Sequence, residues 1–545
     1  MKGNILLLMT CFILSAQNNT TSTNKLERPK LVVGIVVDQM RWDFLYRYYD
    51  KYESGGFKRL LNDGFSCENT MINYIPSVTA IGHTTLFTGS VPAIHGIAGN
   101  DWFNAKTGKS TYCTDDSTMQ TIGSDSKAGK MSPHNLLAST ITDELRLATN
   151  FQSKVVGVSL KDRAAILPAG HNPTAAFWMD DASGKFITSS YYMPALPSWV
   201  VDFNNSKPID KLLAKGWNTL LPIDQYTEST ADNEEWEGML KGATKPVFPY
   251  DAMKAYTLDH GSLRQMPFGN SLTLQFAKAA IDGYKLGQEN TCDFLTVNCA
   301  STDYSGHLVG PNAVEIEDVY LRLDRDLAAF FTFLDQKIGK GNYLLFLTAD
   351  HGAAHAEGFM KTNKMPTGFL EEKVEKELNK TLEKEFGTTR LVFGVDNFQV
   401  TFNKNRIDSL KLDFDKIKAA TVNYLQHQEG IQFAVDQDKI DDSSVPSILK
   451  EMMINGYNRQ RSGSVLMIPL PGWLPYYSRK GTTHGVWNPY DTHIPLIFMG
   501  WDIKHGSTNR TCYMTDISAT LAALLHIQMP NGCIGTPITE VTKNK

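Results

Sequence analysis

Several short apolar runs in this chain end in side chains that bind divalent metal ions. Leu31–Val37 is continuous and β-branched, too short for a core helix, and Asp38 follows it directly. Parallel strands place their carboxyl ends at one edge of a sheet, where ligands bind. The pattern therefore predicts an α/β fold with metal ligands gathered at that edge. The runs are residues 31–37, 294–299 and 343–349, and the candidate ligands are Asp38, Asp303, His307, Asp350, His351 and His484.

The length of the chain allows one large core with insertions. Its 545 residues exceed the usual size of a single domain. We expect a mostly parallel central sheet with helices on both faces, including further strands at residues 154–159 and 494–499. The expected core comprises residues 29–174, 291–366 and 476–545. A cap-like insertion at 175–290 and a small α+β subdomain at 367–475 would interrupt it.

The inserted regions have patterns of their own. Residues 175–290 are rich in Trp, Tyr, Pro and Asn without a sustained period, which is typical of a segment that covers a site. A charged run from Leu370 to Phe386 predicts a helix at the start of the subdomain. Residues 313–334 have apolar side chains at helical spacing, and we expect the acidic face of that helix to lie in solvent.

The first residues have the layout of a cleavable secretory signal. Lys2 precedes an apolar stretch from Ile5 to Leu14, and Ser15 and Ala16 precede a polar segment. The apolar stretch is too short to span a bilayer, which disfavours its retention as an anchor. We expect a signal peptide at residues 1–16, cleavage near Ala16, and a periplasmic or secreted protein with no membrane contact.

The cysteines remaining after that cleavage are even in number, which permits disulfides in an oxidising compartment. The sequence does not determine their pairing. Cys512 with Cys533 is the first pair we expect, because the two flank one predicted helix. Cys292 and Cys299 lie in or beside a buried strand and are expected to be buried thiols. The exported cysteines are Cys67, Cys113, Cys292, Cys299, Cys512 and Cys533.

Thr79 is the candidate nucleophile. It follows Pro76-Ser77-Val78 and opens a helix-like segment, so free backbone N–H groups and the positive end of the helix dipole would favour an anion beside it. A bound metal ion could lower the pKa of its hydroxyl. The alternative is that Thr79 only caps the helix, a frequent role for threonine.

Together these residues resemble a known family, the PafA-type alkaline phosphatases, which are periplasmic monoesterases of the alkaline phosphatase superfamily. The similarity runs from about Leu31 to Ile538. It implies an alkaline-phosphatase-like fold. The segments that carry it are Pro76–Ala80, Gly96–Asp101, Ser159–Arg163, Ser301–His307, Ala349–Gly352 and Gly481–His484.

The resemblance also implies roles for individual residues. Thr79 would attack phosphorus and form a phosphothreonine that is then hydrolysed. Two Zn²⁺ ions would be bound, with no third site for Mg²⁺, because Lys161 would occupy its place. The first zinc would be held by Asp303, His307 and His484, and the second by Asp38, Thr79, Asp350 and His351.

Lys161, Arg163 and Asn100 bear on the substrate class. The two cations stand two residues apart just past a predicted strand, so strand alternation would point both the same way. Two cations near the non-bridging oxygens favour a dianionic monoester over a diester, and Asn100 would donate a hydrogen bond to a phosphoryl oxygen. The alternative is that this Lys-Asp-Arg triplet is solvated surface.

Four other histidines are expected to play supporting roles. His83 and His95 lie close to the Thr79 segment and would support its packing or hydrogen bonding. His355 is four residues after His351, and a solvated or hydrogen-bonding role is favoured over ligation because six ligands are already assigned. His493 is expected to be structural or to support a ligand.

Three alternatives to a monoesterase remain. A phosphodiesterase or nucleotide pyrophosphatase of the same superfamily would share the ligands and Thr79 but not Lys161 and Arg163. A sulfatase would need a C-x-P-x-R pattern, which the sequence around Thr79 does not have. A non-catalytic phosphate-binding protein would not need a nucleophile beside metal ligands.

The expected partners are small. They are phosphate monoesters as substrates, with inorganic phosphate as product. Nucleic acid is not expected as a specific partner, because the net charge is −5 and such binding depends on clustered Lys and Arg. We expect the chain to act as a monomer.

Overall fold

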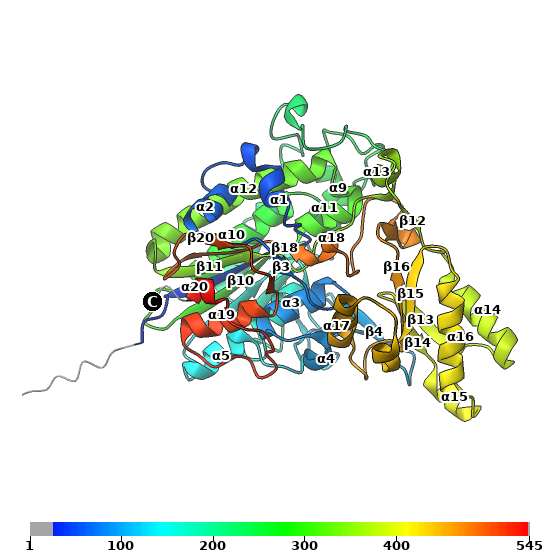
Figure 1. The fold of residues 1–545 in the computed structure, drawn as a ribbon. Coiled ribbons are helices and arrows are strands. Elements are labelled where there is room, and N and C mark those ends of the chain that lie inside the picture. Colours follow the sequence, from blue (N-terminus) through cyan, green and yellow to red (C-terminus); the bar gives the residue numbers. More distant parts are fainter. Residues whose placement is uncertain (1–25, 543–545) are drawn as a thin grey trace, which may run out of the picture.

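The computed structural model describes residues 26–542 and contains a ten-stranded central sheet (Figure 1). Its order is β20-β2-β19-β11-β1-β10-β7-β8-β9-β6. The middle strands are parallel to one another: β11 (Tyr343–Thr348), β1 (Leu31–Val37), β10 (Asp293–Cys299), β7 (Val155–Val158) and β8 (Ala175–Asp180). The flanking strands, which include antiparallel pairings, are β19 (Leu496–Gly500), β2 (Phe65–Cys67), β20 (Gly506–Thr508), β9 (Lys185–Ser189) and β6 (Thr121–Ile122). The core strands expected from the sequence are confirmed.

The strand β1 lies at the centre of the sheet. All seven of its residues are buried, and it pairs with β10 on one side and β11 on the other. A strand covered on both faces must be apolar throughout, which explains why it has no alternating polar residues. The registers Val37↔Cys299 and Val36↔Thr348 bring the carboxyl ends of all three strands together. The segments that follow these strands therefore start from one place.

Helices cover both faces of the sheet (Figure 1). On one face lie α2 (Phe57–Asp63), α10 (Phe268–Tyr284) and α12 (Val314–Leu334), and on the other lie α3 (Thr79–Thr88), α5 (Ile141–Ala148) and α19 (Asp516–Leu525). The helix α6 (Asp162–Ala169) packs against α3. Further helices are α1 (Phe44–Arg47), α4 (Pro92–His95), α11 (Ser301–Val309), α13 (Glu357–Thr362), α18 (Pro489–Thr492) and α20 (Thr539–Thr542). Small sheets outside the centre contain β3 (Thr70–Met71), β18 (His493–Ile494), β21 (Cys512–Tyr513), β4 (Asp101–Phe103), β5 (Ser110–Tyr112), β12 (Gly368–Phe369) and β17 (Trp473–Leu474).

The region expected to be a cap-like insertion joins the core at both of its ends. Its first residues form β8 and β9, which continue the sheet beyond β7. Its last residues form α10, which packs on the sheet face. Between them lie α7 (Ser198–Asn205), α8 (Pro208–Leu213), α9 (Ala252–Leu258) and long irregular stretches. The irregular part is therefore shorter than the 175–290 expected from the sequence.

The acidic face of α12 is buried, contrary to the expectation that it lies in solvent. Asp318 accepts hydrogen bonds from Trp217 Nε1 at 2.7 Å and from Tyr226 Oη at 2.6 Å. Glu317 pairs with Lys51 and is fully buried. The physical reason is that the irregular segment folds over this face and satisfies its carboxylates. Burial of charges requires such partners.

The region 367–475 contains a separate four-stranded sheet, in the order β13-β14-β16-β15, beside the core (Figure 1). The strands are β13 (Val392–Asp396), β14 (Gln399–Phe402), β15 (Ile431–Asp436) and β16 (Val465–Pro469). The helices are α14 (Val374–Phe386), α15 (Lys404–Ser409), α16 (Phe414–Gln426) and α17 (Ser447–Gly456). Side chains such as Leu378, Ile417 and Val465 form a hydrophobic cluster distinct from that of the central sheet. The exact division of the chain into domains stays a prediction.

The cysteine arrangement differs from the expected Cys512–Cys533 pair. Cys512 instead interacts with Cys67, which raises the pKa of Cys67 and lowers that of Cys512. Cys533 lies next to Gly89 instead, and all six cysteines are free thiols. The pairing was misjudged because β21 pairs with β3, close to the end of β2, and that contact is set by the sheet. Cys292 and Cys299 are buried as expected.

The N-terminal and membrane predictions have different outcomes. The signal peptide expected at residues 1–16, with its cleavage near Ala16, lies outside the residues that the structure describes. Within residues 26–542, no helix has the length and apolar character needed to cross a bilayer.

Candidate metal and phosphate site

The candidate ligands lie at the carboxyl edge of the central strands. Asp38 follows β1 and Asp350 follows β11. Asp303 and His307 are one turn apart on α11, which begins directly after β10, whereas His484 comes from the loop before α18. The six candidate ligands, scattered between residues 38 and 484, are thus brought to one edge of the sheet.

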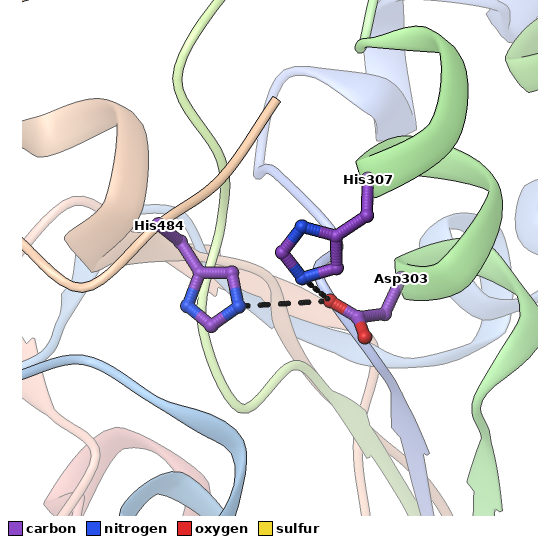
Figure 2. A group of neighbouring side chains, drawn as sticks. All are labelled: Asp303, His307 and His484. Carbon is purple, nitrogen blue, oxygen red and sulfur yellow. Dashed lines mark ion pairs between the residues drawn. The ribbon is translucent and has the colours of Figure 1, made fainter. Parts of the chain in front are cut away.

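The first group consists of Asp303, His307 and His484, whose ligand atoms all lie within 4.8 Å of one another (Figure 2). Asp303 Oδ1 is 3.2 Å from His307 Nε2 and 3.7 Å from His484 Nε2. A carboxylate and two imidazoles that leave further positions open are typical of catalytic zinc sites.

The second group forms around Asp38 and Asp350. His351 Nε2 lies 3.3 Å from Asp350 Oδ2 and 3.7 Å from Asp38 Oδ1. The hydroxyl of Thr79 is 3.4 Å from the same imidazole nitrogen. All four side chains are buried. The residues expected to bind the second metal ion therefore converge.

The unsatisfied atoms of these groups fit a metal ion. Asp38 Oδ1 and Asp350 Oδ2 are buried and have no hydrogen-bond partner. Buried carboxylate oxygens that accept no hydrogen bond are costly, and a divalent cation between them would remove that cost. Both oxygens face His351 Nε2. The side chains of Asp38, Asp350 and His351 could therefore hold a divalent cation between them.

Each of the three imidazoles turns its Nδ1 toward a backbone carbonyl, which also fits metal binding. His307 Nδ1 lies 2.9 Å from the carbonyl of Thr482, His484 Nδ1 lies 2.7 Å from that of Ser77, and His351 Nδ1 lies 3.0 Å from that of Gly352. A ring nitrogen that donates to a carbonyl leaves the lone pair on Nε2. Burial, together with His351 and His307, holds the pKa of His484 well below its usual value, which keeps that ring neutral.

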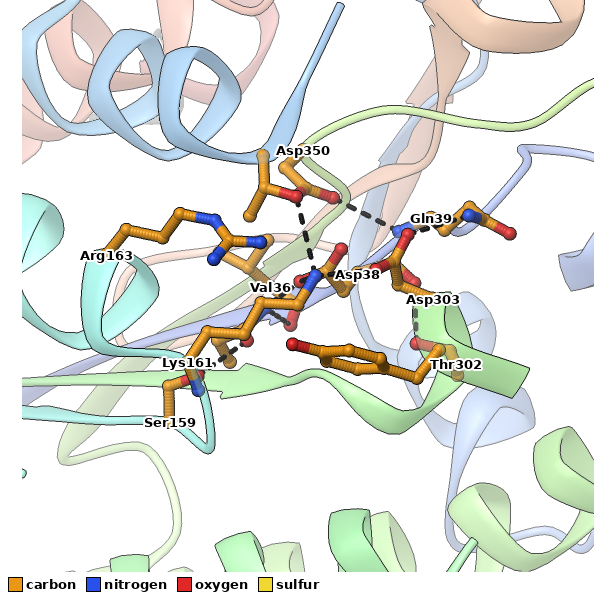
Figure 3. Close-up of polar contacts among 12 residues, drawn as sticks. Val36, Asp38, Gln39, Ser159, Lys161, Arg163, Thr302, Asp303 and Asp350 are labelled. Atoms are coloured by element: carbon orange, nitrogen blue, oxygen red, sulfur yellow. Dashed lines mark hydrogen bonds and ion pairs between the residues drawn. The ribbon is translucent and has the colours of Figure 1, made fainter. Parts of the chain in front are cut away.

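Lys161 lies between the two groups (Figure 3). Its Nζ is 2.6 Å from Asp303 Oδ2, 2.9 Å from Asp38 Oδ2 and 3.4 Å from Thr79 Oγ1. Burial alone would lower its pKa, but Asp303 and Asp38 outweigh burial and raise it, so the ammonium stays charged. A fixed cation therefore stands beside the Thr79 hydroxyl.

The strand-alternation reason given for Lys161 and Arg163 is wrong. The strand β7 ends at Val158, Lys161 is the residue before α6, and Arg163 lies in the first turn of that helix. Both side chains nevertheless reach the site (Figure 3). Arg163 is half-buried and donates from Nη1 to Tyr112 Oη at 3.1 Å.

Asn100 lies against the start of α3, where the sequence predicts that an anion is favoured. Thr79 is the first residue of α3, and the backbone N–H of Ala80 donates to Asn100 Oδ1 at 2.9 Å. Because its carbonyl oxygen is used in this way, the amide nitrogen of Asn100 is free to donate to another group. Thr79 makes no capping bond with its own side chain among the described contacts, which weakens the alternative that it is only a cap.

The other histidines have identifiable partners. His355 lies 2.6 Å from Asn312 Oδ1 and 3.1 Å from Arg41 Nη1, and burial and Arg41 lower its pKa to about 3. His493 Nε2 lies 2.9 Å from the carbonyl of Glu68, and its ring stacks on Trp42. These contacts account for both rings without a metal ion.

His95 and His83 differ from each other. His95 accepts a hydrogen bond from the Ile97 amide, and burial lowers its pKa to about 3. His83 Nδ1 lies 3.0 Å from the carbonyl of Thr79 and 3.3 Å from Asp350 Oδ2. His83 is thus within ligand distance of Asp38 and Asp350, closer to the site than the sequence indicated.

Several site residues were not found from the sequence. Gln39 donates to Asp303, Tyr112 contacts Arg163, and Asp491 Oδ2 accepts from the amides of Gly485 and Val486 just after His484. The position of Gln39 directly after Asp38 could have pointed to it. Asp491 and Tyr112 have no such signal.

A cleft of about 500 Å³ opens onto the site. Asn100, His307 and His484 line its inner end. Its other wall is formed mainly by the region 367–475 and the loop before His484, which contribute aromatic side chains and carboxylates: Phe398, Tyr476, Tyr477, Glu371, Glu372, Glu375 and Asp396. A group attached to a phosphoryl unit at the site would occupy this cleft.

Comparisons with known proteins agree with this geometry. The model of the family described as type I phosphodiesterase / nucleotide pyrophosphatase matches residues 32–493. Alkaline phosphatase PafA of Elizabethkingia meningoseptica is 57% identical over 98% of both chains. A crystal structure of wild-type alkaline phosphatase PafA superposes with a TM-score of 0.94 at 57% identity, covering 95% of this chain and 100% of that one. This match confirms the expected fold.

Two further relatives are similar over nearly their full length. Alkaline phosphatase PhoV of Synechococcus elongatus is 53% identical, covering 95% of this chain and 93% of the relative. A protein of Myroides odoratus named calcium-transporting ATPase is 51% identical, covering 99% of each. The chain therefore belongs to the type I phosphodiesterase / nucleotide pyrophosphatase family and, within it, to the PafA-type alkaline phosphatases.

Proposed function

We propose that this protein is a zinc-dependent alkaline phosphatase that hydrolyses phosphate monoesters through a phosphothreonine on Thr79. Relatives named alkaline phosphatase, at 57% and 53% identity over almost the whole chain, support a phosphate-monoester hydrolase. The nucleophile, the two zinc ions and the phosphoryl-binding cations are the finer parts of the proposal. They rest on the geometry of this chain.

The single observation that carries the proposal is the position of the Thr79 hydroxyl. It lies at the N-terminus of α3, 3.4 Å from His351 Nε2 and 3.4 Å from Lys161 Nζ. A buried hydroxyl that only capped a helix would not need a metal-ligand cluster on one side and a buried ammonium on the other. The ammonium, and a metal ion held by the cluster, would both favour the deprotonated oxygen.

The chain's own residues would orient the phosphoryl group. Arg163 and the amide nitrogen of Asn100 would donate to its non-bridging oxygens, and the first N–H groups of α3 would face the same charge. Lys161 would stabilise negative charge on Thr79 and on the phosphoryl oxygens near it. When bound, two zinc ions would supply Lewis-acid stabilisation of the attacking and leaving oxygens and lower the pKa of hydroxyl and water ligands.

Lys161 and Arg163 favour a monoester over a diester. A monoester dianion presents one more negative charge than a diester, and two cations fixed at the phosphoryl position stabilise that additional charge. The family description also names phosphodiesterases and nucleotide pyrophosphatases. The pair of cations is the feature of this site that separates the two activities.

Comparing turnover of an aryl phosphate monoester with that of its methyl diester tests the proposal. We expect the monoester to be hydrolysed far faster, with zinc restoring activity to chelated protein. Faster diester turnover would overturn the substrate assignment. Measuring calcium-stimulated ATP hydrolysis in the same preparation addresses the different name of the Myroides relative.

The proposal extends to the cellular setting expected from the sequence. The protein would be exported after cleavage near Ala16, act as a monomer on small phosphorylated compounds and release inorganic phosphate. N-terminal sequencing of the mature protein and its mass in solution test these two parts.

A further inference from the structure

Gln39 adopts a strained backbone conformation beside the candidate ligands. It follows Asp38 directly, its φ is 61°, and it is 4% exposed. Residues other than glycine seldom adopt a left-handed φ, and glutamine gains nothing from it locally. Strain of this kind persists where the surrounding structure requires it, often at functional sites.

The turn directs two donors of one residue at two different carboxylates (Figure 3). The backbone N–H of Gln39 donates to Asp350 Oδ1 at 3.1 Å. Its side-chain Nε2 donates to Asp303 Oδ1 at 2.7 Å. Asp303 belongs to the first ligand group and Asp350 to the second. Gln39 therefore connects the two groups through hydrogen bonds.

The chain leaves room for this side chain on the neighbouring helix. Gly306 lies on α11 between Ser305 and His307, and a Cβ added there would come within 1.9 Å of Gln39 Oε1. Any larger residue at 306 would displace the amide. The close approach explains a glycine inside a helix, where it is otherwise unfavourable.

Gln39 adds one hydrogen bond to each of the two carboxylates, Asp303 and Asp350. Asp303 Oδ2 is held by Lys161, so the bond from Gln39 fixes the other oxygen, the one that faces His307 and His484. Asp350 Oδ1 accepts from the amides of Gln39 and His351, which turns Oδ2 toward the second group. A carboxylate held at one oxygen can still rotate about its Cα–Cβ and Cβ–Cγ bonds. In Asp303, where Gln39 holds Oδ1 and Lys161 holds Oδ2, this rotation is prevented.

We propose that Gln39 is a positioning residue that fixes Asp303 through its side chain and Asp350 through its backbone, and so sets the two metal sites relative to each other. This inference rests on the metal sites of the proposed function. Removing a group that hydrogen-bonds a metal ligand typically lowers metal affinity about 10- to 100-fold, and we expect a loss of this size when the Gln39 side chain is removed.

The test compares Gln39→Met with a matched control, Gln437→Met. Gln437 is also a buried glutamine with two side-chain bonds, to Gln399 and the Gly463 carbonyl, but it lies in the region 367–475. Zinc affinity is measured by chelator competition, and the melting temperature of the zinc-free protein by circular dichroism. We expect Gln39→Met to weaken one of two zinc sites about 10- to 100-fold and to leave the other unchanged, because the backbone donor remains. Gln437→Met should lower the melting temperature alone.

A second variant approaches the same bond from α11. Gly306→Ala should crowd the Gln39 amide and weaken the same zinc site, whereas in a Gln39→Gly background, which has no side chain to crowd, it should have no further effect on affinity. A parent protein that binds fewer than two zinc ions overturns the proposed function together with this inference. If the parent binds two and Gln39→Met binds them equally well, or if Gln437→Met shows the same loss of affinity, only the role of Gln39 is wrong.

Discussion

The edge of the central sheet and the wall of the cleft are built in opposite ways. At the sheet edge, Asp38, Lys161, Asp350 and His351 are each at most 1% exposed, and charges meet at distances below 4 Å. On the wall formed mainly by residues 367–475, Glu371, Glu372 and Tyr477 are exposed and make few contacts. The wall belongs to a region with its own sheet and hydrophobic cluster.

This difference in burial separates two functions of the site, the chemical reaction and the selection of leaving groups. Buried charges interact strongly because water does not screen them, so small displacements at the sheet edge change the chemistry by large factors. Exposed charges on the wall interact weakly with what passes them. We therefore expect the sheet edge to set whether the reaction occurs, and the wall to modulate which leaving groups are accepted.

Replacing Thr79 by Ala should have the largest effect. The sheet edge loses its nucleophile, so monoester hydrolysis should fall by about 10³-fold or more, as when a nucleophile is removed from other enzymes. Incorporation of labelled phosphate into the protein measures the intermediate directly. Zinc content should stay near two ions per chain, because six other ligand side chains remain. Labelled phosphate on the variant would show that Thr79 is not the nucleophile.

Removal of metal should affect the sheet edge and spare the wall. Without a cation, Asp38 Oδ1 and Asp350 Oδ2 accept no hydrogen bond within the described part of the chain, so the chelated protein should lose activity and melt at a lower temperature. Hydrogen exchange should rise in α3 and α11 and stay unchanged in α16. Zinc should restore all three quantities. Equal exchange changes in α16 would contradict the separation of the two regions.

Lys161→Ala and Arg163→Ala should come next in size. Each removes a cation from the phosphoryl position, and each should cost about 2–4 kcal/mol of transition-state stabilisation for monoesters. The loss for the methyl diester should be much smaller, because it lacks the additional charge. The ratio of kcat/KM for the two substrates is the measurement. A matched control is Lys418→Ala, which removes a buried, ion-paired lysine from the region 367–475.

The sheet edge could be predicted from the sequence because each part of its pattern is local. A buried strand followed at once by Asp38 or Asp350 is visible without any knowledge of partners. The position of Thr79 at a helix start is likewise a local pattern, and the structure agrees with it. Convergence of these segments then follows from the parallel sheet.

What the sequence could not supply depends on contacts between distant segments. The role of Gln39 requires a left-handed turn and a glycine on α11, which lies 267 residues later in the chain. The buried acidic face of α12 depends on Trp217 and Tyr226, which approach it from an irregular segment. Lys161 reached the site for a different reason than expected, because a helix start follows the strand. Local periodicity carries none of this information.

The smallest effect should come from the wall. Glu371, Glu372, Glu375 and Asp396 line the cleft, and no lysine or arginine is among its lining residues in the described part of the chain. A leaving group with a negative charge should therefore be accepted less well than a neutral or cationic one of the same size. Each exposed carboxylate contributes roughly 0.2–1 kcal/mol, so the expected change is only about two- to five-fold.

Glu371→Gln with Glu372→Gln tests this by comparing phenyl phosphates whose para substituent is a carboxylate or a trimethylammonium group. The ratio of kcat/KM should shift toward the carboxylate substrate by a few-fold, and added salt should erase the preference in the parent. Glu383→Gln with Glu385→Gln, on α14 but outside the cleft lining, is the control.

Burial and the nearby Asp101 raise the pKa of Asp396 to about 6, so this carboxyl is charged above that pH and neutral below it. The preference that remains in the double glutamine variant should therefore weaken as the pH falls through 6. If the double glutamine variant instead changed both substrates by the same large factor, the wall would be acting on the chemistry, and the contrast between the two regions would fail.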